Sequence, residues 1–243
     1  MIYVSITTIP KRIKNIKKSI DSLIEQTQKP DKIFINIPKE FKRFQEKIDD
    51  ALIPKYADDV VEVVRSDDYG PGTKLLGSLD KIKKNSLIIL ADDDNIYEDY
   101  MVEKFYYHYS LAPENAYSFY VHPLKNFGVG QGADGFAINT NALDGIKKFY
   151  DKFVKNNEDL FIHDDLWISF FLFYIKKIKI LSLQSHLKLN YENKLSLIYK
   201  THNQDNGLIS IYGKNINEAV KKRDHIAMKN VENMLKKIKE VKF

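Results

Sequence analysis

The chain has 243 residues, enough for one sizeable α/β domain with a buried core. Hydrophobic residues make up 44% of it, which argues against a disordered protein. The formal net charge of +5 suits a small anionic substrate, but it is too low to favour nucleic acid as a partner. Because the chain contains no cysteine, disulfides and thiolate metal sites are excluded.

The sequence contains no apolar run that approaches the ~18 residues of a membrane-spanning helix. Residues 1–8 lead into a strand-like run without the basic start and long apolar stretch of a signal peptide. We therefore expect a cytoplasmic protein. A peripheral membrane contact through the basic C-terminal segment is a further hypothesis.

Strand-like and helix-like segments alternate through the first 140 residues. Ile2–Ile6 is a β-branched run, and residues 14–26 carry apolar side chains at helical spacing. The next expected strands are 32–37, 60–65, 86–90 and 116–121, and the expected helices are 76–84 and 97–111. This alternation predicts an α/β fold with a mostly parallel sheet covered by helices.

The second half of the chain is less regular. Gly130, Gly132 and Gly135 predict a flexible segment that leads into a strand at 136–139. Two helices are expected next, at 141–155 with Asn141 as its cap and at 164–176. The second of these is nearly apolar, which predicts a buried helix. A late strand at 178–183 and a polar surface segment at 190–213 are expected to follow.

The tail, residues 215–241, reads as a basic amphipathic helix. Its apolar residues Val220, Ala227, Met234 and Val241 fall seven apart, a spacing that could form a homodimer seam. Packing against the parent domain is the simpler interpretation, because the repeat is short and Asp224 interrupts it. We expect one domain over residues 1–213 with a C-terminal helical extension over residues 214–243.

Three carboxylates, Asp92, Asp93 and Asp94, follow directly on the apolar run 86–90. Ligands of open α/β sheets bind beyond the carboxyl ends of the strands, and adjacent carboxylates repel one another without a cation. Asp92 and Asp94 share a face in an extended chain, so one could bind Mg²⁺ or Mn²⁺ and the other a ribose or second ligand. A solvated acidic turn that caps the next helix is the alternative.

A glycine-rich loop precedes that strand. Gly70 and Gly72 permit close approach of the backbone, and Lys74 supplies a positive charge that suits a diphosphate. A simple turn with a solvated lysine is the alternative interpretation.

A second acidic centre, Asp164 and Asp165, stands at the start of the apolar segment 164–176. Helix capping and the helix dipole favour aspartate there, so a structural role is a real alternative. The only tryptophan, Trp167, follows two residues later, and it either lines a sugar site or belongs to the core.

Several segments, in this order, resemble GT-A glycosyltransferases, particularly those of family 2. Asp92–Asp94 resembles their Asp-x-Asp motif, and residues 4–12 resemble the opening strand and loop that cradle the nucleotide base. Residues 22–31 resemble the Ser-Leu-x-x-Gln-Thr-x-x-Pro-Asp segment that ends the first helix, and residues 68–77 the loop before the metal strand. The resemblance implies a GT-A (Rossmann-like) fold, a nucleotide-sugar donor such as a UDP-sugar, and a glycan or other glycoconjugate acceptor.

The resemblance also implies roles for individual residues. Asp165 corresponds to the general base, and Asp164 to a supporting or acceptor-binding group. The residues implied in nucleotide-sugar binding are Thr7, Thr8, Pro10, Arg12, Asp68, Lys74, Asp92, Asp93 and Asp134. Asp134 would bond a sugar hydroxyl, although a solvated loop carboxylate is the alternative. The metal, Mn²⁺ or Mg²⁺, would be held by Asp94 and Asp92, with His202 or His186 as a further ligand from late in the chain.

These roles form a consistent reaction. An inverting transfer needs a carboxylate that takes the proton of the acceptor hydroxyl. A metal would stabilise the charge that develops on the departing nucleotide diphosphate. Two alternatives remain: a sugar nucleotidyltransferase, although the glycine run that it needs in the first loop is missing, and a non-catalytic carbohydrate-binding or scaffold protein of the same fold.

Overall fold

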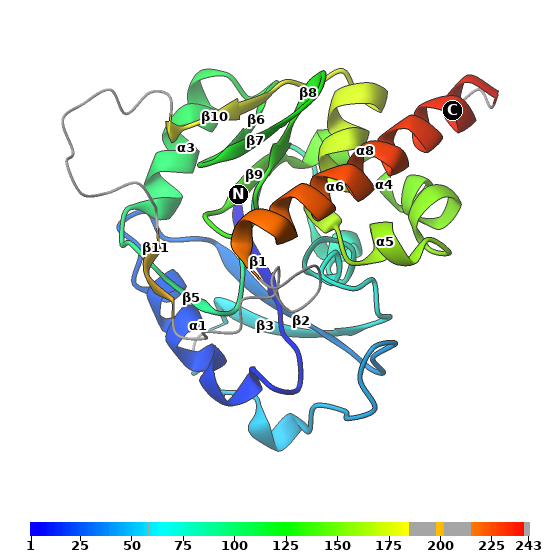
Figure 1. The fold of residues 1–243 in the computed structure, drawn as a ribbon. Coiled ribbons are helices and arrows are strands. Elements are labelled where there is room, and N and C mark those ends of the chain that lie inside the picture. The colour runs from blue at the N-terminus through cyan, green and yellow to red at the C-terminus, as the bar shows by residue number, and fades with distance from the viewer. Residues whose placement is uncertain (58, 185–197, 202–214, 241–243) are drawn as a thin grey trace.

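A computed structural model describes residues 1–57, 59–184, 198–201 and 215–240, and it is built around one seven-stranded sheet (Figure 1). The strand order is β10-β6-β9-β4-β1-β2-β3. The bounds are β1 Ile2–Thr7, β2 Lys32–Pro38, β3 Val61–Ser66, β4 Leu87–Leu90, β6 Ala116–Ser118, β9 Phe136–Asn139 and β10 Ile180–Ser182. Within this sheet β9 alone runs antiparallel to its neighbours, so the predicted mostly parallel α/β sheet is confirmed.

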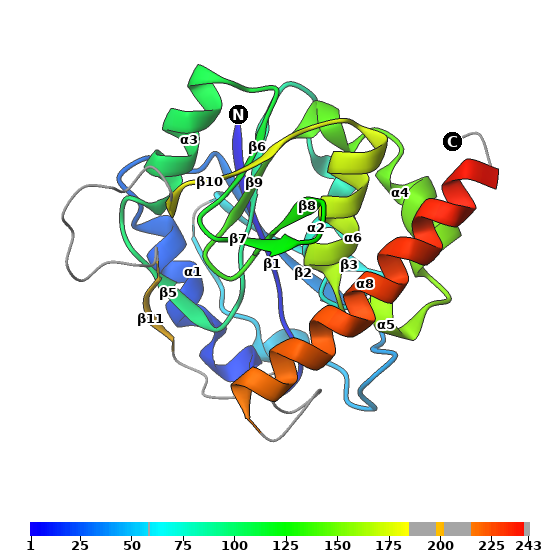
Figure 2. The same cartoon turned by 45° about the horizontal axis from the view of Figure 1, so that its top comes forward.

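Helices cover both faces of the sheet (Figures 1 and 2). α1 (Ile16–Ile24) and α3 (Met101–Leu111) lie on one face. The other face carries α2 (Thr73–Leu76), α4 (Ile146–Phe149), α5 (Glu158–Phe161), α6 (Asp164–Phe170) and the long α8 (Ile216–Glu240).

Two hydrophobic cores, one on each face, explain why the strands read as continuous apolar runs. In β4, Leu87 and Ile89 belong to the core under α1 and α3, whereas Ile88 and Leu90 belong to the core under α2 and α6. Successive side chains of a strand point to opposite faces, so a strand covered on both sides must be apolar at every position. This arrangement leaves the carboxyl ends of the strands as the place for polar chemistry.

The helix predicted at 76–84 is wrong. The structure has α2 over Thr73–Leu76, and a separate 3₁₀ turn follows at Leu79–Lys81. The helix ends where the Lys74 carbonyl accepts hydrogen bonds from the side chains of Ser5 and Asn36. A tertiary contact with β1 and β2 therefore sets this boundary, not the local sequence.

Other boundaries also differ from the prediction. The helix expected from 97 begins at Met101, because Asn95–Tyr97 forms strand β5, which pairs with β11 (Ile198–Thr201). The strand expected at 116–121 stops at Ser118, and a hairpin of β7 (Val121–Leu124) and β8 (Phe127–Gly130) follows. Gly130, which is expected to open a flexible segment, therefore ends a strand.

The helix expected at 141–155 is divided into a 3₁₀ turn at Thr140–Leu143, α4 and a π-helical turn at Tyr150–Val154. Gly145, with φ +84°, separates the first two, and the cap is Asn139, whose side chain accepts the N–H of Asn141 at 3.0 Å. The segment 164–176 is helical and buried as predicted: α6 continues into a π-helical turn at Phe171–Ile175.

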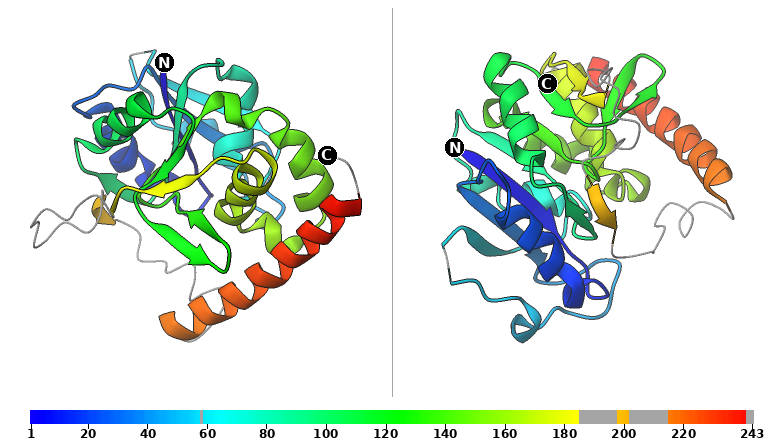
Figure 3. Two further views of the ribbon diagram at one scale, coloured as in Figure 1. Left: turned by 90° about the horizontal axis from the view of Figure 1, so that it is seen from above. Right: turned by 90° about the vertical axis from the view of Figure 1, so that its left-hand side faces the viewer.

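The C-terminal helix is present and packs on its own domain (Figure 3). Ala227, Val231 and Met234 are buried in the same core as the side chains of α6, which is the simpler of the two interpretations of the apolar repeat. Val241 and the expected boundary at 213/214 lie outside the described residues. Among the described residues no helix is both long and apolar enough to cross a membrane.

Candidate active site

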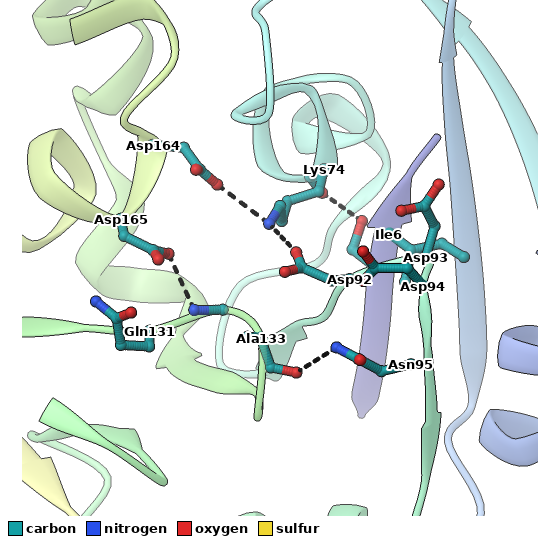
Figure 4. A network of polar contacts seen from close by, with 12 residues as sticks. Ile6, Lys74, Asp92, Asp93, Asp94, Asn95, Gln131, Ala133, Asp164 and Asp165 are labelled. Atoms are coloured by element: carbon teal, nitrogen blue, oxygen red, sulfur yellow. Dashed lines mark hydrogen bonds and ion pairs between the residues drawn. The ribbon is translucent and has the colours of Figure 1, made fainter. Parts of the chain in front are cut away.

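The two acidic centres, some 70 residues apart in the sequence, meet at the carboxyl edge of the sheet (Figure 4). Lys74 of α2 joins them. Its Nζ lies 2.6 Å from Oδ1 of Asp92, which follows β4, and 3.3 Å from Oδ2 of Asp164, which opens α6. Burial alone would lower the pKa of Lys74, but the surrounding carboxylates, Asp164 first, outweigh it and raise that pKa well above the usual value. The amine therefore stays charged.

Buried polar side chains of β1 and β2 fix the position of Lys74. The side chain of Asn36, on β2, donates hydrogen bonds to Ser5 Oγ at 2.8 Å and to the Lys74 carbonyl at 3.3 Å. Asn36 and Ser5 are fully buried, so these bonds replace water for groups that would otherwise be unpaired. A Cβ at Gly77 would come within 2.7 Å of the Asn36 amide oxygen, so the helix can approach this closely only with glycine there.

Arg12 organises the other half of the aspartate triplet. It lies in the turn after β1, where its N–H bonds back to the Ile9 carbonyl at 2.9 Å. Its NH1 donates to Asp93 Oδ1 at 2.8 Å and lies 3.2 Å from Asp94 Oδ2. Burial raises the pKa of Asp93, and the guanidinium offsets only part of that rise.

Asp165 lies on the opposite side of Lys74 from the triplet. Its Oδ1 accepts the backbone N–H of Gly132 at 3.0 Å. Burial, followed by the charge of Asp164, raises the pKa of Asp165 well above its usual value. A Cβ on Gly132 would lie 3.2 Å from Lys74 Nζ and 3.3 Å from Asp165 Oδ1, so this backbone covers the centre of the cluster.

The cluster holds more negative than positive groups. Five carboxyl groups, Asp92, Asp93, Asp94, Asp164 and Asp165, face two cations, Lys74 and Arg12. Burial and the charge of Asp92 raise the pKa of Asp94 to about 6. Burial also favours neutral Asp92, but Lys74 more than offsets this and lowers the pKa of Asp92. The excess of carboxylates favours a bound cation at the Asp94 end.

Sequence reasoning missed the residues that brace this edge. The Tyr97 hydroxyl accepts the N–H of Asp92 at 2.7 Å and lies 3.1 Å from the carbonyls of Asp92 and Ala133. Asn95 also donates to the Ala133 carbonyl, at 3.2 Å. The sequence predicts a helix from residue 97, and nothing local indicates that the Tyr97 ring reaches the loop that carries Gly132.

The other predicted residues lie at varying distances from this cluster. Thr8 is buried beside Asp93. Thr7 instead donates a hydrogen bond to the Asn36 carbonyl at 2.8 Å. Pro10 belongs to the turn that carries Arg12. Asp134 lies in the tight turn closed by the Gly135 N–H and the Gly132 carbonyl. His186 and His202 lie outside the described residues.

Two predicted residues have structural surroundings. Asp68 accepts hydrogen bonds from the backbone N–H groups of Lys42 at 2.7 Å and Gly70 at 2.8 Å. These bonds join Asp68 to its neighbouring loop backbone and not to the carboxylate cluster. Trp167 is fully buried, and its ring lies 2.6 Å from where a Cβ of Gly72 would be. Of the two interpretations of this tryptophan, the core position is correct.

The described residues contain no group of three or more histidine, aspartate or glutamate side chains arranged to hold a metal on their own. Mg²⁺ commonly keeps several waters and binds through one or two carboxylates and substrate phosphates, so a pair of aspartates suits it. Within the same described part, Arg12 Nε is buried without a hydrogen-bond partner. A buried polar atom left unpaired at a strand edge fits a site that is completed by a ligand.

A cavity of about 190 Å³ opens beside Asp164 and Asp165, and its lining includes none of Asp92, Asp93 and Asp94. His122 of β7, together with Arg223 and Asp224 of α8, forms its polar wall. Leu124, Val129 and Leu166 contribute apolar surface. The acidic pair therefore separates two regions, one rich in aspartate and arginine and one with a mixed lining.

No family model matches the sequence, and no curated protein matches it either. Several solved structures align with it. Residues 1–349 of TarS from S. aureus align with a TM-score of 0.50 at 13% identity over 75% of this chain and 58% of that one. The cytidylyltransferase IspD of Francisella tularensis gives 0.48 at 14% identity, over 74% and 89% of the two chains. The galactosyltransferase LgtC gives 0.46 at 8% identity, over 96% of both.

Identities this low bear on the fold alone. The likeness to TarS, together with the mostly parallel sheet and its flanking helices, agrees with the GT-A architecture that the sequence motifs implied. The chain therefore has a GT-A-type α/β fold.

Proposed function

We propose that this chain is a metal-dependent glycosyltransferase that moves a sugar from a nucleotide-sugar donor to a hydroxyl group of a glycan or other acceptor. One observation carries the proposal: two acidic centres distant in sequence converge on the buried amine of Lys74, at the edge of the sheet where α/β folds bind ligands. A purely structural role would not explain five carboxyl groups gathered around two cations.

The donor belongs on the side of Asp92–Asp94. A diphosphate is an anion, and the excess of carboxylates there would repel it unless a cation intervened. Asp94 and Asp92 offer the hard oxygen ligands that Mn²⁺ or Mg²⁺ prefers, and the remaining ligands would be phosphate oxygens and water. Such an ion would stabilise the negative charge of the departing nucleotide diphosphate. Arg12, held between Asp93 and Asp94, would contact the same phosphates.

The acceptor belongs on the side of Asp165. A base that takes the proton of a hydroxyl works best when its pKa approaches the working pH, and burial with Asp164 raises the pKa of Asp165 in that direction. The N–H of Gly132 orients the carboxylate. A single base facing the acceptor, with no covalent intermediate, corresponds to an inverting transfer. Asp164 is a supporting group that keeps Lys74 between the two centres.

A UDP-sugar is the first donor to try. TarS of S. aureus has been crystallised with UDP-GlcNAc and with UDP, and its fold is shared here. The alternatives predict other behaviour. A non-catalytic carbohydrate-binding protein would not turn over any donor, and a sugar nucleotidyltransferase would release pyrophosphate from a nucleoside triphosphate.

The test is hydrolysis of a panel of nucleotide-sugars without an acceptor, with Mn²⁺ and then with EDTA. We expect one donor to release its nucleoside diphosphate slowly and only with the metal. Asp94→Ala should abolish release, while Asp99→Ala, an exposed aspartate of the same segment, should not change it. Absence of turnover with every donor would contradict the proposal.

A further inference from the structure

The mixed-lining cavity beside Asp165 is completed by α8, which lies beyond the segments that carry the resemblance. α8 closes one side of it through Arg223, Asp224 and Ala227, and the β7–β8 hairpin contributes His122. The two segments are joined through their side chains. His122 Nε2 lies 3.1 Å from both carboxylate oxygens of Asp224 and 3.2 Å from Arg223 NH2. Arg223 donates to Asp224 Oδ1 from Nε at 3.1 Å and from NH2 at 3.0 Å.

This trio, His122–Arg223–Asp224, forms an ordered polar wall. The side chains of His122 and Arg223 are 18% and 17% exposed, and that of Asp224 is 32% exposed. The trio brings the donors of Arg223 and the acceptors of Asp224 to the same cavity, which suits sugar hydroxyl groups because each hydroxyl can both donate and accept. An anionic group fits poorly, since Arg223 already pairs with Asp224 and the carboxylates of Asp164 and Asp165 line the same cavity.

Part of the cavity lining is apolar. Leu124, Leu166 and Ala227 offer surface for the C–H face of a sugar ring, and hydroxyl groups at the rim would reach the trio. The volume of about 190 Å³ gives this cavity room for a sugar ring.

We infer that the C-terminal helix completes the acceptor site, and that the His122–Arg223–Asp224 trio selects one neutral, hydroxyl-rich sugar ring as the accepting residue. The inference rests on the proposed function, which assigns Asp165 to the acceptor side. It gives α8 a binding role in addition to its packing role. Arg223 and His122 are binding residues and take no part in the proton transfer.

The experiment is an NMR titration of the full chain that follows the histidine ring signals. The probes are methyl glycosides of glucose, galactose, mannose, rhamnose and the two common N-acetylhexosamines, with methyl glucuronide as the anionic member. We expect at least one neutral glycoside to shift the signals of His122 and His163, which line the cavity, and to leave exposed His225 of α8 unchanged. No such shift with any neutral glycoside, or tighter binding of the glucuronide, would overturn the inference.

Variants make the assignment specific. Arg223→Ala should weaken binding of the active glycoside by about tenfold, the loss of one charge-assisted hydrogen bond. Lys222→Ala, an exposed neighbour on α8, should leave it unchanged. Ala227→Phe should block the cavity and abolish binding. Unchanged affinity in both Arg223→Ala and Ala227→Phe would contradict the inference.

Donor hydrolysis separates the two proposals. Lys222→Ala should hydrolyse the nucleotide-sugar at the wild-type rate, because its exposed side chain lines neither the donor side nor the cavity. If the wild type hydrolyses no donor, the proposed function fails, whatever the NMR titration shows. If hydrolysis is normal and the glycosides do not bind in the cavity, only the role of α8 in the acceptor site fails.

Discussion

Lys74 donates a hydrogen bond to Asp92 across 2.6 Å, and this contact ties α2 to the end of β4. The side chain of Lys74 is 5% exposed and that of Asp92 is 32% exposed, so the pair is largely removed from water. The same amine reaches Asp164, and the pair thereby also fixes the start of α6. The relationship gives Lys74 a positioning role in addition to any contact with phosphate.

Replacing Lys74 should cost more than replacing a surface lysine. Lys74→Met leaves buried carboxylates without their partner, and we expect the free energy of unfolding to fall by about 3 kcal/mol, the lower end for a broken buried pair. The control is Lys17→Met, which breaks the exposed pair of Lys17 with Asp21 and should cost less than ~0.5 kcal/mol. Urea unfolding measures both, and equal small losses would contradict the buried pairing.

Asp165→Asn should raise stability at neutral pH while it lowers turnover. The unfolded carboxyl ionises near pH ~3.9, and the folded one ionises only at higher pH because of burial and Asp164. Between these two values the folded state binds more protons, so stability falls as pH rises through that window. The asparagine variant is free of this loss. Its gain over the wild type should therefore be present at pH 8 and vanish near pH 4.

Thermal unfolding of both proteins at the two pH values tests this prediction. A variant that is less stable than the wild type at pH 8 would be inconsistent with a raised pKa of Asp165. Turnover should fall by roughly 10²–10⁴-fold, the usual contribution of a positioned base. The Gly132 N–H can still donate to the asparagine oxygen, so the loop should keep its place.

Gly132→Ala should lower activity with little change in stability, whereas Gly72→Ala should lower stability. A Cβ at Gly132 meets Lys74 Nζ and Asp165 Oδ1 at 3.2 and 3.3 Å, so we expect about tenfold lower turnover from the displaced base and little change in stability. A Cβ at Gly72 meets the buried Trp167 ring at 2.6 Å, and overpacking of this kind costs roughly 1–3 kcal/mol. Circular dichroism melts and donor hydrolysis, measured on both variants, would separate the two effects. Equal melting temperatures would contradict this account.

Tyr97→Phe tests the brace behind the aspartate triplet. The variant keeps the ring but leaves the N–H of Asp92 without its partner, which should destabilise the protein by roughly 1–3 kcal/mol. Tyr117→Phe is the matched control, because its hydroxyl bonds the Ala112 carbonyl far from the site. A loss of metal-dependent hydrolysis should accompany only the first variant. Intact hydrolysis in Tyr97→Phe would show that the brace does not position Asp92.

The parallel sheet and both acidic centres were predictable because their signals are local. A β-branched run that ends in Asp92–Asp94 places the carboxylates at a strand edge, and Asp164–Asp165 before an apolar run marks a helix start. The contacts that join these pieces were not predictable. Lys74 meets Asp164 only after the chain folds, and the distance from His122 to Asp224 along the sequence is about 100 residues.

Local signals also misled where tertiary contacts prevailed. The helix expected to begin at Leu76 instead starts at Thr73 and ends at Leu76. Within it, the side chains of Ser5 and Asn36 donate hydrogen bonds to the Lys74 carbonyl. Gly130 is expected to open a flexible segment, yet it ends β8, and a Cβ there would lie 2.8 Å from the ring of Phe136. Glycine can indicate a flexible segment or a tight contact, and sequence alone does not distinguish them.

The most direct test of the central claim is calorimetric titration of UDP into the wild type and Asp94→Ala, each with and without Mn²⁺. We predict binding to the wild type only when the metal is present, because the excess of carboxylates around Asp94 repels the diphosphate without it. Asp94→Ala should lose the metal-dependent binding. Failure of the wild type to bind UDP under either condition would contradict a nucleotide-sugar site at this edge of the sheet.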